Sequence, residues 1–296
     1  MLRKQKISPD EFGGNVMINM IRADFYRMIR GVGIYFALAL MTLMIAVSVY
    51  LTSPGNIGIH VGAVDEQPDE VLGQMTYEEF SSLGIKELRE IRLKSTNYKL
   101  DKEILGSNIN LYYIFLFAAV IIVTADFSGS CVKNTLSSAI SRKKYFFSKV
   151  VFITGCCLIL FFLNTYIMYF ANRIFNGSNL SSSLNEITLI TLRQVPVVFA
   201  LAGILSGFSF LLKRTALFNT VMIPFIMVGQ MVLNLLILLF RWIPESIMNY
   251  ELQRMFLQLA GTPSSGYLLR SYLVCAGIVA VSCLIGWFSF CKTEIR

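Results

Sequence analysis

Basic side chains gather in one short polar stretch of the chain, residues 126–149. Asp126 is its only acidic residue, and its cations are Lys133, Arg142, Lys143, Lys144 and Lys149. Ammonium and guanidinium groups bind acidic partners and orient membrane proteins, but they do not by themselves break bonds. Strongly apolar segments flank the stretch on both sides, and a basic connection between two such segments predicts a position on the cytoplasmic side of a membrane.

Residue patterns that would support catalysis are missing from the sequence. It contains no G-x-x-x-x-G-K-[ST] phosphate loop, no G-x-S-x-G elbow and no H-E-x-x-H helix. His60 is the only histidine, which excludes a histidine cluster for a metal. We therefore expect no catalytic residue, no metal and no cofactor in this chain.

Composition predicts an integral membrane protein. Hydrophobic residues make up 55% of the chain and charged residues 15%, whereas soluble domains carry about 25% charged residues. The net charge of +8 lies largely beside the apolar segments, as the positive-inside rule expects. We therefore expect membrane lipid, and no nucleic acid, as the partner of this charge.

Apolar runs long enough to cross a bilayer predict an all-α fold with six transmembrane helices. They cover residues 33–51, 109–124, 150–170, 187–212, 217–240 and 268–290. An even number of spans with basic residues near both ends predicts a multi-pass protein of the cell membrane, with both termini in the cytoplasm.

Between and before the spans lie four polar segments. Residues 53–108 are expected to form an extracellular loop, and residues 126–149 a cytoplasmic one. Residues 241–266 are too polar to span but have an amphipathic face. Residues 15–30 fit a basic amphipathic helix in the membrane interface or, alternatively, the basic flank of the first span. Its apolar side would hold Met17, Ile18, Ile21, Phe25, Met28 and Ile29, with Asp24 as an exception.

The polar stretch also has an internal helical pattern. Val132, Leu136 and Ile140 follow one another at intervals of four, so they would share one helix face. Such a helix either docks on another protein or lies on its own membrane, and the residue pattern alone supports both interpretations equally.

The string ADFSGSCVKNTLSSAISRKKYFFSKV resembles the segment after the second span of ABC-2 type transporter permeases. The matching features are an acidic–aromatic pair, a Gly-Ser turn, a Lys-Asn pair, an Ile-Ser-Arg step and an aromatic return that ends in lysine. In residue numbers these are Asp126-Phe127, Gly129-Ser130, Lys133-Asn134, Ile140-Ser141-Arg142 and 145–149. The layout is similar over nearly the whole chain. The recognisable motif covers about forty residues.

The resemblance implies a coupling helix between spans 2 and 3, an N-terminal elbow helix at 15–30, and outer re-entrant helices at 241–266. It also implies two ABC ATPase subunits, which bind ATP and Mg²⁺, and a second permease copy or a paralogue. The expected ATPase contacts are Gly129, Lys133, Asn134, Leu136, Ser141, Arg142, Lys143, Arg22 and Arg27. The expected substrate path holds Tyr112, Tyr113, Thr124, Gln230 and Asn234.

The resulting expectation is a permease subunit that exports a hydrophobic or amphipathic substrate, such as a peptide or an antimicrobial. Two alternatives stay open at this point. One is a membrane scaffold or sensor that transports nothing. The other is an intramembrane enzyme, which the missing nucleophile and metal patterns disfavour.

Overall fold

The computed structural model describes residues 9–52, 111–128, 132, 135, 140–177, 182–240, 245–261 and 263–292. These residues are almost entirely helical, and none of them lies in a strand. The predicted all-α class is therefore confirmed for this part of the chain. The predicted extracellular loop, 53–108, falls outside the described residues.

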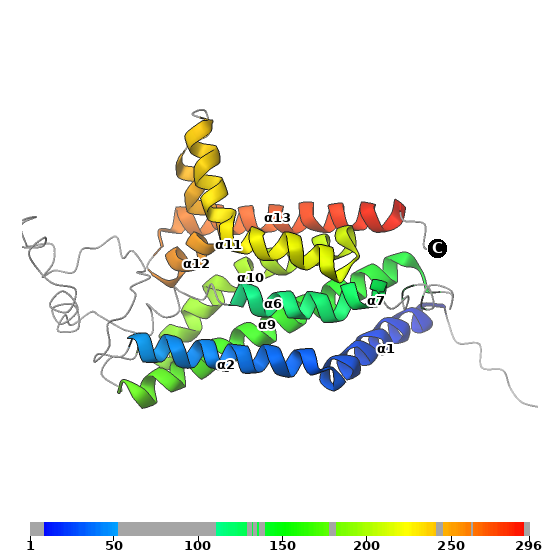
Figure 1. Ribbon diagram of the computed structural model, residues 1–296, viewed down its shortest axis with the longest axis horizontal. Coiled ribbons are helices and arrows are strands. Elements are labelled where there is room, and N and C mark those ends of the chain that lie inside the picture. Colours follow the sequence, from blue (N-terminus) through cyan, green and yellow to red (C-terminus); the bar gives the residue numbers. More distant parts are fainter. Residues whose placement is uncertain are drawn as a thin grey trace, which may run out of the picture.

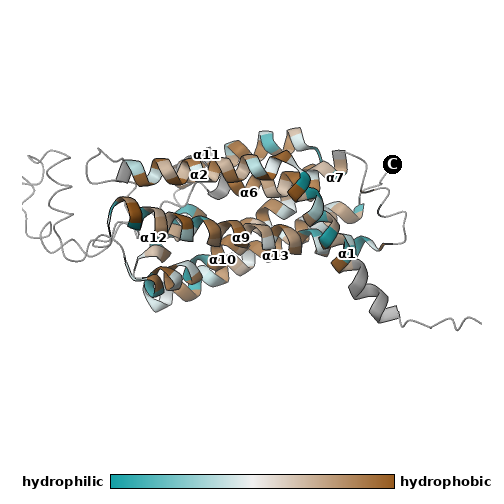
Figure 2. Ribbon diagram, turned by 90° about the horizontal axis from the view of Figure 1, so that it is seen from below, coloured by the Kyte–Doolittle hydropathy of each residue, from teal (hydrophilic) through white to brown (hydrophobic). Residues whose placement is uncertain are grey.

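Four of the helices are long and apolar enough to cross a membrane. They are α2 (Val32–Thr52), α9 (Arg142–Phe175), α10 (Leu184–Leu212) and α13 (Ser265–Lys292). They run side by side in a bundle, and brown apolar ribbon covers most of their length (Figures 1 and 2). Many large apolar side chains stay exposed on the outside, such as Leu43, Ile159 and Phe288, as expected where lipid replaces water.

Two more apolar helices complete the bundle. The first is α6 (Leu111–Ala119), which continues through the π-helical segment η2 (Val120–Thr124) into α7 (Ala125–Ser128). The second is α11 (Thr215–Leu239), which contains Pro224. Proline removes a backbone hydrogen bond and kinks helices, and the later part of α11 projects away from the bundle (Figure 1).

The first helix, α1 (Pro9–Arg30), lies at the end of the bundle where α13 also ends (Figure 1). It begins six residues before the predicted interface helix and stops at the same residue. Only part of its predicted apolar side packs on the bundle: Met28 is buried, whereas Ile18, Phe25 and Ile29 are about half exposed. The helix thus has one face on the protein and a second apolar face turned outwards.

At the opposite end, two short helices connect α11 to α13. They are the 3₁₀ helix η4 (Glu245–Tyr250) and α12 (Leu252–Ala260), within the segment 241–266 for which an amphipathic face was expected. Met255, Phe256 and Leu259 are buried. Gln194 of α10 donates a hydrogen bond of 2.9 Å from Nε2 to the carbonyl of Phe256, which fixes α12 against α10.

The predicted cytoplasmic loop 126–149 is shorter in the structure, because both of its ends are helical. Asp126 belongs to α7, and α9 begins at Arg142, eight residues before the expected start of the third span. The hydroxyl of Ser141 accepts a hydrogen bond of 3.4 Å from the backbone nitrogen of Lys144 and caps the helix. The run of cations after Ser141 therefore forms the first turn of a long helix.

Candidate functional site: a buried ion-pair cluster beside the predicted coupling segment

Four charged side chains from three helices meet at the end of the bundle where α1 lies. We call them the ion-pair cluster: Asp24 and Arg27 of α1, Asp126 of α7 and Lys149 of α9. Along the chain, Arg27 and Asp126 are 99 residues apart, and Asp24 and Lys149 are 125 residues apart. The cluster therefore joins α1 to the two helices that flank residues 129–139.

Lys149 is at the centre of the cluster. Its Nζ lies 2.7 and 2.8 Å from the two carboxylate oxygens of Asp24 and 2.6 Å from Oδ2 of Asp126. The side chain of Lys149 is only 3% exposed. An unpaired buried ammonium is very costly, and this lysine is instead paired with two carboxylates.

Arg27 closes the cluster from the outside. Its guanidinium donates to Oδ1 of Asp126 at 2.5 Å and to Oδ1 of Asp24 at 2.8 Å. The arginine side chain is 44% exposed, whereas the side chains of its two acidic partners are 5% and 4% exposed. Two carboxylates thus face two cations, and the planar fork of arginine bridges the two acids.

The hydroxyl of Tyr145 adds a neutral contact. It donates a hydrogen bond of 2.9 Å to Oδ2 of Asp126, and the ammonium of Lys149 lies 5.3 Å from the centre of the tyrosine ring. The same ring stacks on Phe290 of α13 at 5.6 Å. The tyrosine therefore connects the charges to an apolar layer that also includes Phe210 of α10.

Burial also affects the proton affinity of the cluster. It raises the pKa of Asp24 above its ordinary value, and the lowering effects of Lys149 and Arg27 do not fully cancel it. Asp126 contributes to the rise as a neighbouring negative charge. The charged form of Asp24 therefore depends on Lys149 remaining in place.

Only part of this site could be recognised from the sequence. Asp24 stood out as an acid on the apolar side of an amphipathic helix, and Asp126 and Lys149 as the ends of the basic stretch. What periodicity could not reveal is that these three meet. An acid on an otherwise apolar helix face is itself the available signal, because burying it requires a cation from another helix.

Arg27 is the one predicted ATPase contact that lies in the cluster. Arg22 is exposed on α1, Lys143 is exposed in the first turn of α9, and Ser141 caps that helix. Arg142 donates a hydrogen bond of 2.7 Å to the carbonyl of Cys291 and so joins the start of α9 to the last turn of α13. The other four predicted contacts, Gly129, Lys133, Asn134 and Leu136, lie outside the described residues.

Two members of the predicted apolar face of this segment are described. Val132 is 2% exposed and belongs to the core of the protein, and Ile140 packs against that core. Two members of the predicted apolar face, Val132 and Ile140, therefore turn towards this chain's own bundle. This observation disfavours docking on another protein through the apolar face of the segment.

Of the five predicted substrate-path residues, the structure describes the side chain of Thr124. Thr124, at the end of η2, is fully buried, donates to the carbonyl of Val120 at 2.9 Å and accepts from Thr215 at 3.1 Å. Thr124 thus lies in a contact between η2 and α11. Tyr112 and Tyr113 belong to α6, and Gln230 and Asn234 to α11, but their side chains fall outside the described part.

Across the residues that the structure describes, no group of three or more His, Cys, Asp or Glu side chains could hold a metal ion. Neither a scan against models of known protein families nor a search of curated proteins finds a match for this chain. The functional argument therefore rests on the motif in the sequence and on the geometry of the ion-pair cluster.

Proposed function

We propose that this chain is the membrane-spanning subunit of an ATP-driven exporter similar to the ABC-2 type permeases. In this proposal α6–η2–α7 and α11 cross the membrane along with the four long helices, which gives six spans with both termini in the cytoplasm. Separate ATPase subunits bind ATP and Mg²⁺, and a second permease copy or paralogue completes the path.

The position of the ion-pair cluster is the observation that supports this proposal most directly. Asp126 lies in α7, before the predicted coupling segment, and Lys149 lies in α9, after it. The two form an ion pair, and each also contacts α1: Asp126 through Arg27 and Lys149 through Asp24. A displacement of residues 129–139 would therefore be transmitted to α1 as well as to α7 and α9. An exporter driven by a separate ATPase needs such a mechanical connection, since its spans need no proton relay of their own.

The packing of Val132 indicates which side of the coupling segment would meet the ATPase. Because Val132 and Ile140 face the bundle, the polar side of the segment is left for a partner. Lys133 and Asn134 fall beside the apolar ridge in the sequence pattern. We infer a polar, charge-guided contact that is sensitive to salt.

The proposed cargo is an amphipathic peptide or a hydrophobic antimicrobial, as the family resemblance implies. The path would run between two permease subunits. Thr124 is already engaged with α11, so within one subunit this residue supports helix packing.

Affinity purification in mild detergent, followed by an ATPase assay on the material that co-purifies, tests the proposal. The Lys133→Glu/Lys143→Glu variant changes two cations of the basic stretch and spares Arg142, whose guanidinium has a partner within the chain. We expect the wild type to retain an ATP-hydrolysing subunit and this variant to lose it. Arg270→Glu is the matched control, because Arg270 is an exposed cation near the start of α13, at the opposite end of the bundle.

Loss of the ATPase from the Arg270→Glu control as well would indicate a general charge effect and contradict a contact at the basic stretch. A wild-type chain that purifies without any ATPase under these conditions would overturn the proposal. The scaffold or sensor alternative would then be the better account of the protein.

A further inference from the structure

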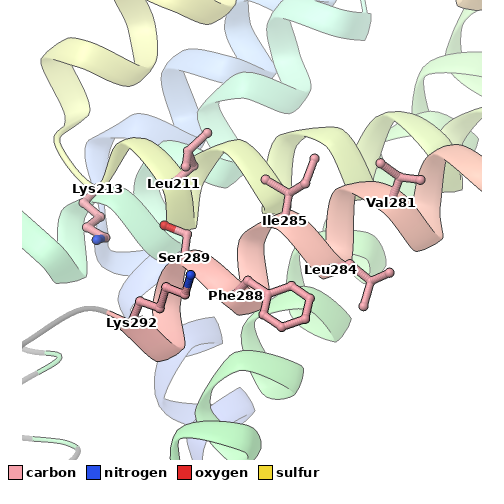
Figure 3. Close-up of a pocket in the computed structure, with 8 residues that line it drawn as sticks. All are labelled: Leu211, Lys213, Val281, Leu284, Ile285, Phe288, Ser289 and Lys292. Carbon is pink, nitrogen blue, oxygen red and sulfur yellow. The ribbon is translucent and has the colours of Figure 1, made fainter.

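A groove of about 680 Å³ opens on the outside of the bundle, between the ends of α10 and α13. Figure 3 shows its eight lining residues, with both ammonium groups at the same end. The lining residues are Leu211, Lys213, Val281, Leu284, Ile285, Phe288, Ser289 and Lys292. Six of the eight come from α13, where they recur at intervals of three and four and so share one face.

The lining changes from apolar to cationic along the helix axis. Val281, Leu284, Ile285 and Phe288 are apolar and between 48% and 59% exposed. Lys292 follows one turn later at the end of α13, and Lys213 faces the same end from the turn after α10. The eight lining residues include no carboxylate. An amphipathic molecule with one negative end matches this gradient.

The backbone at Lys213 is the second notable feature of the groove. This residue ends α10 with a φ of 54°, the one positive φ among the non-glycine residues that the structure describes. Glycine is the usual residue in this left-handed position, because any side chain adds steric cost there. The lysine at this position therefore carries a steric cost, and its ammonium group lies at the mouth of the groove.

We propose that this groove binds one anionic phospholipid. The lipid phosphate lies between the ammonium groups of Lys213 and Lys292. One acyl chain follows the apolar face of α13 past Phe288 and Leu284 towards Val281. The proposal does not depend on the exporter function, since it concerns only the outer surface of α10 and α13.

Charge complementarity favours a lipid over a second copy of this chain as the occupant. Two copies that met groove to groove would bring two pairs of lysines together, and the like charges would repel each other. An anionic headgroup is attracted to both lysines instead. The groove also lies on the apolar exterior, where hydrocarbon is the expected neighbour of exposed leucine and phenylalanine side chains.

Native mass spectrometry of the full chain in detergent micelles, with added dioleoyl phosphatidylglycerol or dioleoyl phosphatidylcholine, tests the proposal. We expect wild type to retain one phosphatidylglycerol in preference to phosphatidylcholine. Lys213→Gly and Lys292→Gln should each weaken phosphatidylglycerol binding by about fivefold, the effect of one lysine near an anionic lipid surface. Lys144→Gln, an exposed lysine of α9 outside the groove, is the matched control and should leave binding unchanged.

Lys213→Gly separates lipid binding from folding. Glycine fits the left-handed backbone, so this variant should keep or raise the melting temperature in lipid-free detergent while it binds phosphatidylglycerol more weakly. Phe288→Ala should weaken binding of both lipids, since it removes an acyl contact and no charge. Equal binding of the two lipids by wild type, or undiminished phosphatidylglycerol binding by the Lys213→Gly/Lys292→Gln double variant, would overturn the proposal. So would a stable dimer that the double variant dissociates.

Discussion

Two contacts between helices stabilise this bundle by different means, one through charge and the other through close packing. The ion-pair cluster joins α1, α7 and α9 through four charges at one end. The contact between α10 and α13, which we call the glycine seam, is made by Gly203 and Gly207 of one helix and Gly286 of the other. Its helices approach so closely that a Cβ atom on Gly207 would overlap the carbonyl oxygen of Ser282, and one on Gly286 would lie 2.9 Å from the Cα of Gly207.

The two contacts differ in the rearrangements and substitutions that each can tolerate. The glycine seam is fixed by shape, because the two helices lie too close together for a Cβ atom at Gly207 or Gly286. The cluster is fixed by charge, so its groups can exchange partners or be replaced in balanced pairs. We therefore expect α10 and α13 to move as one unit, and α1 to be the element that can be released from the bundle.

Lys149→Met should have the largest effect on the cluster. It leaves two buried carboxylates with one half-exposed arginine. Breaking a buried ion pair by removing one partner costs about 3–5 kcal/mol. The melting temperature in mild detergent, followed by size-exclusion chromatography, measures the loss.

A balanced double variant provides the control for Lys149→Met. Asp24→Asn combined with Lys149→Met removes one charge of each sign and leaves Arg27 paired with Asp126. This double variant should be more stable than Lys149→Met alone, which no shape-based contact would predict. Equal melting temperatures for the two variants would contradict a cluster held by charge.

Gly207→Ala should come next, with a loss of about 1–3 kcal/mol from overpacking. The added Cβ meets backbone atoms of α13, which cannot rotate away as a side chain would. The same melting assay measures the effect, and Gly277→Ala is the matched control because nothing lies within 4 Å of a Cβ at that position. A second change that trims Ser282 to glycine should not rescue Gly207→Ala, since the overlap is with the backbone carbonyl oxygen of Ser282.

Tyr145→Phe should cost about 1.5–3 kcal/mol at most, the range for a hydrogen bond to a charged group. The ring and its stacking on Phe290 remain, so only the donor to Asp126 is lost. Chemical denaturation in detergent resolves a change of this size. Phe146→Tyr in the same layer should not rescue it, because no partner at Asp126 is restored.

Arg27→Gln should have the smallest effect, about 1 kcal/mol or less, although Arg27 contacts the same two acids as Lys149. Its side chain is 44% exposed, so water can solvate the carboxylate oxygens that it leaves. The comparison with Lys149→Met isolates burial as the variable. A loss as large as that of Lys149→Met would show that exposure does not weaken this arginine's contribution.

Most of the bundle could be predicted from the sequence, because long apolar runs have few alternatives in a membrane. The four long helices cover predicted spans, and Met255, Phe256 and Leu259, which are buried in α12, belong to the amphipathic face expected between residues 241 and 266. The start of α9 was missed because a run of cations in its first turn opposes the helix dipole. The hydroxyl of Ser141 caps the helix there, and Arg142 has a carbonyl acceptor on α13.

The candidate site was harder to predict for a different reason. Helical periodicity relates residues three or four positions apart, whereas Asp24 and Lys149 are separated by 125 positions. One sequence shows that Asp24 needs a cation but not which of 26 lysines and arginines supplies it. The glycine seam was missed for the same reason, since each glycine acquires its role only from the helix opposite.

The balance of charge in the cluster has an electrical consequence. Two carboxylates and two cations sum to zero, so moving the cluster as one body transfers no net charge through the membrane field. A single unpaired charge that crossed the whole field would couple to voltage by about 2.3 kcal/mol per 100 mV. The cluster therefore adds no voltage dependence of its own to a motion of α1 together with α7 and α9.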